Sequence, residues 1–568
     1  MTFEIQINNK PVTVKRGETI LEVLNRIGIK VPTLCSMKGF APTGMCRMCV
    51  IEVEGKENLI PACSFKVEEW MKIQTHSPRV VHARKTIVEL LLANHPDDCL
   101  FCERNGNCEL QTLAEELHVR ERTIKGEKRK FYIDQSALSI VYDTDKCILC
   151  GRCIRVCRET IGNHTFDFAY RGKRMSVLPA LNKNLNHSNC LQCGQCIMVC
   201  PTAALSDKVN FSEFKVFFHD VNKKAVAVYS PAVATTLAET LGLKSKASLH
   251  GILSAVFRKL GFDYIIDSSI GADLMLQMQC EEFISRLKAN DKFPMVTSCC
   301  PSWVKYFEQL SIDNLHLLSS QKSSGQMAGH IAKRYISKKD NIAVENIITV
   351  SIVPCTSRKY EAKRPEMVID GITDTDAVIT TRELLRMIKM NGIDINNIEP
   401  EPWSGFFATN SSAGKLVNIA GGTTEAFIIN LHYELTGKIL DGLKPLNTRN
   451  LKEYKEFSLN IGDHLINFVI VNGLSGINKV IDIIKEGKKD IHFIEVMVCQ
   501  GGCIAGGGQP LPASEESLKL RLKNIYEAVD SAAIRTCYEN ASLAEMLREE
   551  IIDKNNLRAL FLKKEVLL

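Results

Sequence analysis

The stretch CILCGRCIRVC at residues 147–157 returns as CLQCGQCIMVCP at residues 190–201. Both copies have the spacing Cys-x2-Cys-x2-Cys-x3-Cys, which is the ligand run of bacterial ferredoxins with two 4Fe–4S clusters. In such runs the fourth cysteine binds the cluster of the other run. We therefore predict two clusters, one held by Cys147, Cys150, Cys153 and Cys200 and the other by Cys190, Cys193, Cys196 and Cys157. Arg158 replaces the proline that usually ends the first run, and this change affects no ligand.

A third group of cysteines precedes this double ferredoxin-like domain, which we place at residues 138–209. Its members are Cys35, Cys46, Cys49 and Cys63. Four thiolates on one small domain suit a 2Fe–2S cluster. Alternating strands at FEIQINN and KPVTVKR, an Asn8-Asn9 turn and a helical GETILEVLNRIGI predict a small β-rich unit over residues 1–80. This unit resembles the β-grasp fold of plant-type ferredoxins, with the longer first gap of the large iron–sulfur subunit of respiratory complex I.

A fourth group lies in the helical segment that we expect over residues 81–125. It consists of His95, Cys99, Cys102 and Cys108. One imidazole and three thiolates suit either a 4Fe–4S cluster or a tetrahedral zinc ion, and the spacing leaves both open. With iron–sulfur ligands throughout the first third of the chain, the sequence predicts a chain of electron carriers.

Composition agrees with an intracellular iron–sulfur protein. The chain has 568 residues and 22 cysteines, 15 of them between Cys35 and Cys200. The N-terminus has no apolar signal segment, and no apolar run approaches the roughly 18 residues of a membrane span. We therefore expect a cytoplasmic protein that does not associate with a membrane. In that compartment, metal binding explains the cysteines better than disulfide bonds do. A net charge of +6, with 71 basic and 65 acidic residues mixed, does not indicate nucleic acid.

The chain changes character from about residue 222, where apolar strands alternate with helices, and we expect a mixed α/β domain over residues 222–510. Three motifs there carry further cysteines: TSCCPSW at 297–303, VPCTSRKYE at 353–361 and EVMVCQGGCIAGGGQP at 495–510. They supply four thiolates, the number for one more 4Fe–4S cluster, and leave Cys299 over. The four predicted ligands are Cys300, Cys355, Cys499 and Cys503. Residues 511–568 are predicted to be a helical C-terminal segment that begins near Ser514.

These motifs resemble the three signatures of the FeFe (iron-only) hydrogenases, and the domain order resembles the long clostridial type. The resemblance implies a multidomain α+β fold with a hydrogenase catalytic domain, and an H-cluster at the four cysteines. In that cofactor a 4Fe–4S cubane is joined through Cys503 to a di-iron subsite with carbon monoxide, cyanide and azadithiolate. It further implies reversible oxidation of dihydrogen, maturation proteins for the subsite, and ferredoxin or a similar small carrier as electron partner of a chain that we expect to be a monomer.

The resemblance also implies individual roles. Cys299 matches the cysteine that takes the proton from the bridging amine, Glu282 and Ser319 match later members of the proton relay, and Met497 matches a methionine beside the di-iron site. Arg358 stands where the family has a lysine that donates to cyanide, and Lys359 beside it is an alternative donor. Other departures are Val353 for methionine, Gln279 for a relay glutamate, and Ser230-Pro231-Ala232 for Ala-Pro-Ser. A family glutamine near the cofactor falls on Gly325 here, with Gln326 next to it as an alternative.

These departures bear on rate and direction, and Arg358 and Gln279 leave a sensory, low-turnover relative as an alternative. A catalytic subunit of an electron-bifurcating complex, which would need partner chains, is another alternative. A non-enzymatic iron–sulfur assembly factor with the same domain would lack the full third motif and the N-terminal series of clusters. A complex I-type subunit would share residues 1–208 but not the three motifs. Cys280 and Cys537 have no predicted role beyond that of small, buried or surface thiols.

Overall fold

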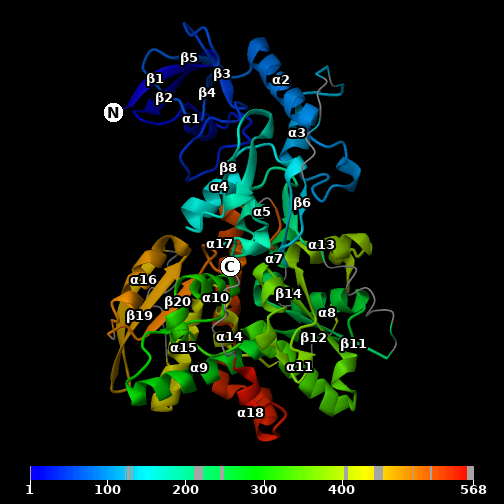
Figure 1. Cartoon of the computed structure of the whole chain (residues 1–568), viewed down its shortest axis with the longest axis vertical. Helices are drawn as coiled ribbons and strands as arrows, with labels where there is room; N and C mark the ends of the chain where they lie inside the picture. Colours follow the sequence, from blue (N-terminus) through cyan, green and yellow to red (C-terminus); the bar gives the residue numbers. More distant parts are fainter. Residues whose placement is uncertain are drawn as a thin grey trace. The chain divides into compact units, whose positions relative to one another are not determined.

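The computed structural model describes the chain except residues 1, 122, 125–127, 129–131, 210–219, 221, 243–248, 402–406, 408, 441–451, 489, 512–513 and 559–568. The contacts divide it into two compact units (Figure 1). The first contains residues 1–158, 164–188 and 199–206, and the second contains residues 159–163, 189–198 and 207–568. The double ferredoxin segment therefore contributes residues to both units.

The first unit begins with a five-stranded sheet in the order β2-β1-β5-β3-β4. Its strands are β1 Thr2–Ile7, β2 Lys10–Lys15, β3 Val50–Val53, β4 Ile60–Pro61 and β5 Lys72–Gln74. Asn8 and Asn9 have positive φ angles and form the predicted two-residue hairpin turn. The predicted helix is α1, Ile20–Arg26, whose N-terminus is capped by Thr19 and whose apolar face is buried on the sheet.

The remaining elements of the first unit carry the other cluster loops. Helices α2, Pro78–Asn94, and α3, Glu109–Glu116, pack together on either side of the His95 group. Helix α2 begins at Pro78, slightly before the predicted helical segment 81–125, and α3 within that segment is short. The ferredoxin-like part consists of β6 Ile133–Asp134, β7 Ile140–Asp143, α4 Arg152–Arg155, β8 Phe166–Ala169, β9 Ser176–Pro179, α5 Gln195–Val199 and β10 Leu205–Asp207.

The second unit is built on two four-stranded sheets, as the mixed α/β pattern predicts. One is parallel, in the order β12-β11-β14-β17. Its strands are β11 Lys224–Tyr229, β12 Tyr264–Asp267, β14 Ile347–Val353 and β17 Ala377–Thr380. The other has the order β13-β20-β19-β18, with only β18 antiparallel. Its strands are β13 Met295–Val296, β18 Tyr454–Ile461, β19 His464–Asn472 and β20 Phe493–Met497.

Helices pack against both sheets and bury most of their strands (Figure 1). The long helices α9 and α11 contact each other, and α11 also contacts β14. Helix α17 begins at the predicted N-cap, Ser514, and packs on α7 and α14. The helices are α7 Pro231–Thr240, α8 Leu249–Lys259, α9 Ser269–Ala289, α10 Pro301–Leu310, α11 Ser324–Asp340, α12 Ser357–Glu361, α13 Thr381–Met390, α14 Ser412–Leu416, α15 Gly422–Thr436, α16 Ile477–Lys485, α17 Glu515–Asp530 and α18 Ala541–Arg548.

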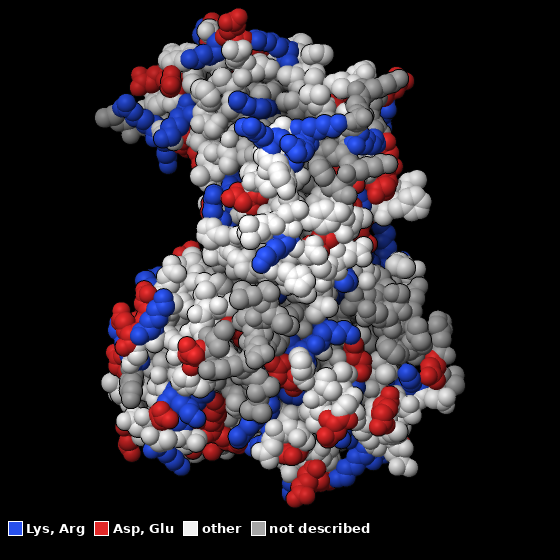
Figure 2. All heavy atoms as spheres, viewed as in Figure 1, with Lys and Arg blue, Asp and Glu red and all other residues white. Residues whose placement is uncertain are grey.

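On the face presented in Figure 2, basic and acidic side chains are intermingled. This distribution agrees with the near balance of 71 basic and 65 acidic residues. No helix in the described part of the chain is long and apolar enough to cross a membrane.

Candidate functional site

The three cysteine motifs of the second unit follow the ends of strands. Cys300 comes after β13 and directly precedes α10, Cys355 comes after β14, and Cys499 and Cys503 come after β20. Strands β13 and β20 are parallel neighbours, so their loops leave the same edge of that sheet. The charges of the four thiols act on one another, so these distant residues lie together.

The surroundings of these thiols suit an iron cluster. Burial raises the pKa of Cys499 well above its ordinary value, and the neighbouring thiolates of Cys355, Cys300 and Cys503 raise it further. Four ionised thiolates at such a place need a cationic group among them, which iron supplies. Within the described residues no three His, Cys, Asp or Glu side chains converge on a single metal ion. A cluster does not require this, because each of its irons takes its own thiolate.

The glycines of the third motif bring backbone close to the cysteines. A Cβ at Gly506 would lie 2.3 Å from the Pro354 oxygen, and one at Gly502 would lie 2.6 Å from the Ala420 nitrogen. Gly502 also has a φ of +84°, which favours glycine. Side chains at these positions would force the loops away from Cys355 and Cys503.

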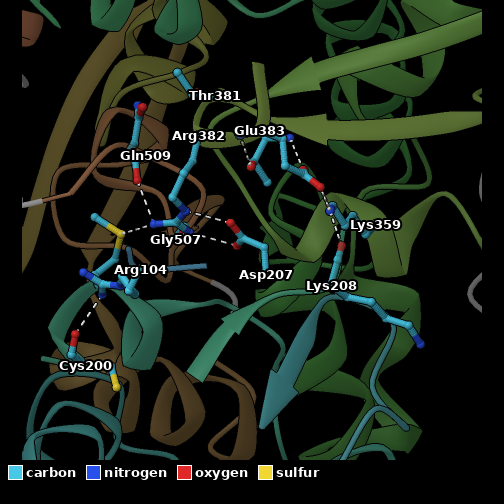
Figure 3. A network of polar contacts seen from close by, with 12 residues as sticks. Arg104, Cys200, Asp207, Lys208, Lys359, Thr381, Arg382, Glu383, Gly507 and Gln509 are labelled. Carbon is cyan, nitrogen blue, oxygen red and sulfur yellow. Dashed lines mark hydrogen bonds and ion pairs between the residues drawn. The ribbon is translucent and has the colours of Figure 1, made fainter. Parts of the chain in front are cut away.

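Arg382 at the start of α13 holds the glycine-rich loop in place (Figure 3). Its guanidinium donates to the carbonyls of Gly507 at 2.7 Å and Gln509 at 2.9 Å, and it forms an ion pair with Asp207 at 2.7 Å. The guanidinium and the carboxylate are both buried, so each charge is compensated by the other and by the loop carbonyls. Sequence reasoning missed Arg382, because nothing in its local pattern points to a loop more than 120 residues away.

The structure separates the two candidate cations of the second motif. Arg358 donates to the Cys299 carbonyl at 2.9 Å and to Glu361 at 2.6 Å. Burial opposes its charge, but Glu361, Cys355 and Cys503 outweigh burial and raise the pKa of Arg358. Lys359 instead forms a buried ion pair with Glu383 at 2.7 Å and donates to the Lys208 carbonyl (Figure 3). Arg358 is therefore the cation beside the cysteines.

Cys299 is buried next to the four-thiol site. Burial raises its pKa to about 12, with further contributions from Cys300 and Glu495, and its nearest polar contact is the Thr423 hydroxyl at 3.9 Å. Met497, at the end of β20, belongs to the same apolar core as Cys299 and Cys503. The roles that the resemblance implies for these two residues stay predictions.

Glu282 and Ser319 are in direct contact, and their roles in a proton relay stay a prediction. The Glu282 carboxylate accepts from the Ser319 hydroxyl at 3.3 Å and pairs with Arg286. Sequence reasoning missed three of its partners: Arg286, the Ser320 hydroxyl and backbone, and the Gln321 amide, the last two each at 3.0 Å.

Gln279 is the residue that stands where the resemblance expects a relay glutamate. It stands one turn before Glu282 on α9 and is buried, and its amide oxygen has no hydrogen-bond partner among the described residues. An amide does not exchange a proton as a carboxylate does. Among the described contacts, no hydrogen bond links Cys299 to Gln279 or Glu282.

Of the other departures, Ser230 is linked to the four-thiol site by hydrogen bonds through Asn418. A Cβ at Gly325 would meet nothing closer than the Ser351 hydroxyl at 3.7 Å, so the missing side chain leaves room, and the buried Gln326 amide oxygen lacks a described partner. Ser230 donates to the Asn418 side chain at 2.6 Å, and the Asn418 carbonyl accepts from the Cys503 backbone at 2.9 Å.

Val353, the last residue of β14, packs in a small apolar cluster with Ala362 and Val378. Cys280 and Cys537 are buried, as one of the two expectations for them required, and they interact electrostatically. Neither is linked to the four-thiol site by a described hydrogen bond.

In the first unit, the predicted 2Fe–2S ligands form one group. Cys35 lies against Cys46 and Cys49 against Cys63, and the charges of the two pairs also act on each other. Backbone N–H groups of Met45 and Gly44 approach the sulfurs of Cys35 and Cys63.

The His95 group also has a feature of a ligand set. His95 is buried at the end of α2, and its Nδ1 lies 3.2 Å from the Pro96 carbonyl. Its Nε2 is buried without a hydrogen-bond partner among the described residues. A histidine that binds a metal through one nitrogen usually donates through the other to a carbonyl or carboxylate. Cys102 and Cys108 lie near each other, and Cys99 is exposed.

One of the two ligand sets predicted for the double ferredoxin segment lies within the first unit. Its members Cys147, Cys150, Cys153 and Cys200 interact electrostatically, so the structure brings Cys200 together with three cysteines of the first run. Arg104 holds the Cys200 carbonyl at 2.8 Å (Figure 3). The set of Cys190, Cys193, Cys196 and Cys157 draws on both units and stays a prediction.

The cysteine-rich groups of the first unit and the four-thiol site of the second unit are together typical of an iron–sulfur oxidoreductase. Comparison with known proteins gives its family. Residues 223–507 match the family described as iron only hydrogenase large subunit, C-terminal domain. Three iron–sulfur families match the N-terminal third: a 2Fe–2S cluster binding domain at 1–78, the NADH-ubiquinone oxidoreductase-G iron–sulfur binding region at 84–123, and a 4Fe–4S dicluster domain at 146–204. The match at 84–123 favours iron–sulfur over zinc for the His95 group.

Two relatives match along nearly their whole length. The chain is 36% identical to NADP-reducing hydrogenase subunit HndD of Solidesulfovibrio fructosivorans, over 95% of this chain and 94% of that protein. It is 33% identical to iron hydrogenase 1 of Clostridium pasteurianum, over 95% and 96%. A solved structure of FeFe-hydrogenase HydA1 from Chlamydomonas reinhardtii has a TM-score of 0.53 and 27% identity, covering 61% of this chain and 97% of that one. The chain therefore belongs to the FeFe hydrogenases, oxidoreductases that act on dihydrogen.

Proposed function

We propose that this chain catalyses the reversible conversion of dihydrogen into protons and electrons at an H-cluster held by Cys300, Cys355, Cys499 and Cys503. The convergence of these four thiols from three distant motifs is the observation that carries the proposal. When bound, the H-cluster supplies the iron chemistry that splits or forms dihydrogen. The protein holds that cofactor, excludes water from it, and moves protons and electrons.

Proton movement starts at Cys299 in this proposal. Its thiol is buried, and the raised pKa keeps it protonated at neutral pH, so it is able to donate a proton and take one back. Glu282 and Ser319 then form the outer part of the route. Gln279 interrupts a continuous chain of acidic groups, and a water molecule must therefore carry the proton past it. Arg358 holds the Cys299 backbone and supplies positive charge beside the cofactor.

Electrons pass through the accessory clusters, which we assign as one 2Fe–2S and three 4Fe–4S clusters, including that of His95. We propose ferredoxin or a similar small carrier as the partner of a cytoplasmic enzyme. A second candidate is a catalytic subunit within a pyridine-nucleotide-reducing complex. The 36% identity to HndD, which is named as a subunit of an NADP-reducing hydrogenase, favours this candidate.

The test uses the full chain produced together with maturation proteins. Infrared bands of carbon monoxide and cyanide would identify the H-cluster, and dihydrogen evolution from reduced ferredoxin would identify the activity. If the matured protein has no such bands, the proposal is wrong. Bands with very slow turnover would favour a sensory protein. Activity that appears only when partner subunits and a pyridine nucleotide are added would favour the complex.

A further inference from the structure

The loop between two ligands of the neighbouring cluster contacts the four-thiol site directly. Gln195 lies between Cys193 and Cys196 and begins α5. Its amide nitrogen Nε2 donates to the Cys499 sulfur at 3.2 Å and to the Ala505 carbonyl at 2.9 Å. The two N–H groups of one amide are thus both used, one of them on a predicted ligand of the H-cluster.

Close packing fixes the position of this loop. A Cβ at Gly194 would lie 2.5 Å from the Thr356 hydroxyl, and one at Gly507 would lie 2.2 Å from the Cys193 carbonyl. The Thr356 hydroxyl donates to the Gln192 carbonyl at 2.8 Å. The three residues that precede Gln195 are therefore held closely against Thr356 and Gly507, which limits the freedom of the amide to turn away from Cys499.

The same contact brings two predicted cluster sites together. The charges of Cys193 and Cys499 act on each other, so an electron on one cluster would be felt at the other. Hydrogen bonds to the sulfurs of an iron–sulfur cluster are one of the factors that set its reduction potential. A donor stabilises the more negative, reduced form, because it compensates charge on the thiolate.

We propose that Gln195 is a positioning residue for electron transfer, whose amide donates to the Cys499 thiolate and makes the H-cluster cubane easier to reduce. The inference rests on the proposed function, because it needs an H-cluster at Cys499. It adds a residue from outside the three motifs that sets how electrons divide between the cofactor and the adjacent cluster.

A purely structural role would give a different result. Gln195 also holds the Ala505 carbonyl, so its loss loosens the loop as well as removing a donor from sulfur. Ser302 provides a matched control, because its hydroxyl donates to the Leu191 carbonyl of the same loop at 3.2 Å. Ser302→Ala loosens this loop without removing a bond to Cys499.

The experiment is a redox titration of the matured full chain, followed by the carbon monoxide bands that report only the H-cluster. In Gln195→Leu we expect the ratio of reduced to oxidised cofactor at the wild-type midpoint potential to fall roughly three- to tenfold, where tenfold corresponds to about 59 mV for one electron. Gln195→Glu replaces the donor by an anion of the same shape and should shift the midpoint further in the same direction. Gln195→Glu also serves as the second variant if Gln195→Leu does not take up the H-cluster.

Three results would overturn the inference. One is an unchanged midpoint in Gln195→Leu, and another is an equal shift in Ser302→Ala. The third is loss of the cofactor from both Gln195 variants but not from Ser302→Ala, which would assign Gln195 a structural role only. Absence of the bands from the wild-type protein would instead contradict the proposed function, so the two failures are distinguishable.

Discussion

Replacing Arg358 by lysine tests the cation beside the cysteines. The guanidinium bonds Glu361 at 2.6 Å and the Cys299 carbonyl at 2.9 Å at the same time. A lysine ammonium is a single point on a flexible stem and does not reproduce this planar fork. We expect it to stay with the Glu361 carboxylate and to leave the Cys299 carbonyl without its donor.

The lost bond is buried and charge-assisted, so it should cost about 1.5–3 kcal/mol. A rise of about 1.36 kcal/mol in the activation free energy lowers a rate tenfold. If the whole cost of the lost bond raised the activation free energy, turnover would fall by roughly 10- to 150-fold. We expect Arg358→Lys to assemble its cofactor, because the positive charge is kept. It should shift the cyanide band, lower the melting temperature and change the ratio of dihydrogen oxidation to production.

Arg364→Lys is the matched control for this variant. Arg364 is also buried and forms ion pairs with Glu308 at 2.5 Å and Glu366 at 2.9 Å. Its replacement should lower stability by a similar amount without moving the cyanide band. An unchanged band in Arg358→Lys, combined with a shifted band in Lys359→Ala, would refute the assignment of Arg358 as the donor.

Three other variants test separate parts of the molecule. Cys299→Ser should keep the H-cluster bands but retain less than about a tenth of wild-type turnover, because a hydroxyl is a far weaker acid than a thiol; higher activity would mean another proton exit. His95→Ala should lose about four iron atoms per chain and no zinc, as measured by elemental analysis, if the group holds a 4Fe–4S cluster. Burial raises the pKa of Glu495 to about 7, so its contribution to stability is present below about pH 4.5 and is lost as pH rises to 7. The free energy of unfolding of wild type, relative to that of Glu495→Gln, should therefore be higher at pH 5 than at pH 8 by roughly 3 kcal/mol, as measured by denaturant unfolding at the two pH values. A larger advantage of wild type at pH 8 would mean that Gly421 and Thr424 hold the carboxylate ionised.

Much of the first unit followed from local sequence. The Asn8-Asn9 turn and the helix behind Thr19 both agree with the structure. Turns, caps and closely spaced ligands are decided by residues only a few positions apart, so their physical rules apply directly to the sequence. The motif cysteines of the second unit were also identified by their spacing and by resemblance to the family.

The tertiary structure decided which of these residues meet. Arg358 and Lys359 are adjacent in sequence, yet one contacts the Cys299 carbonyl and the other pairs with Glu383. Gln195 reaches Cys499 across 304 positions of the chain, and no local pattern indicates that contact. Such pairings depend on which strand ends share a sheet edge and on which loops backbone packing brings together. Those are consequences of burying the whole core at once, and no single stretch of sequence carries them.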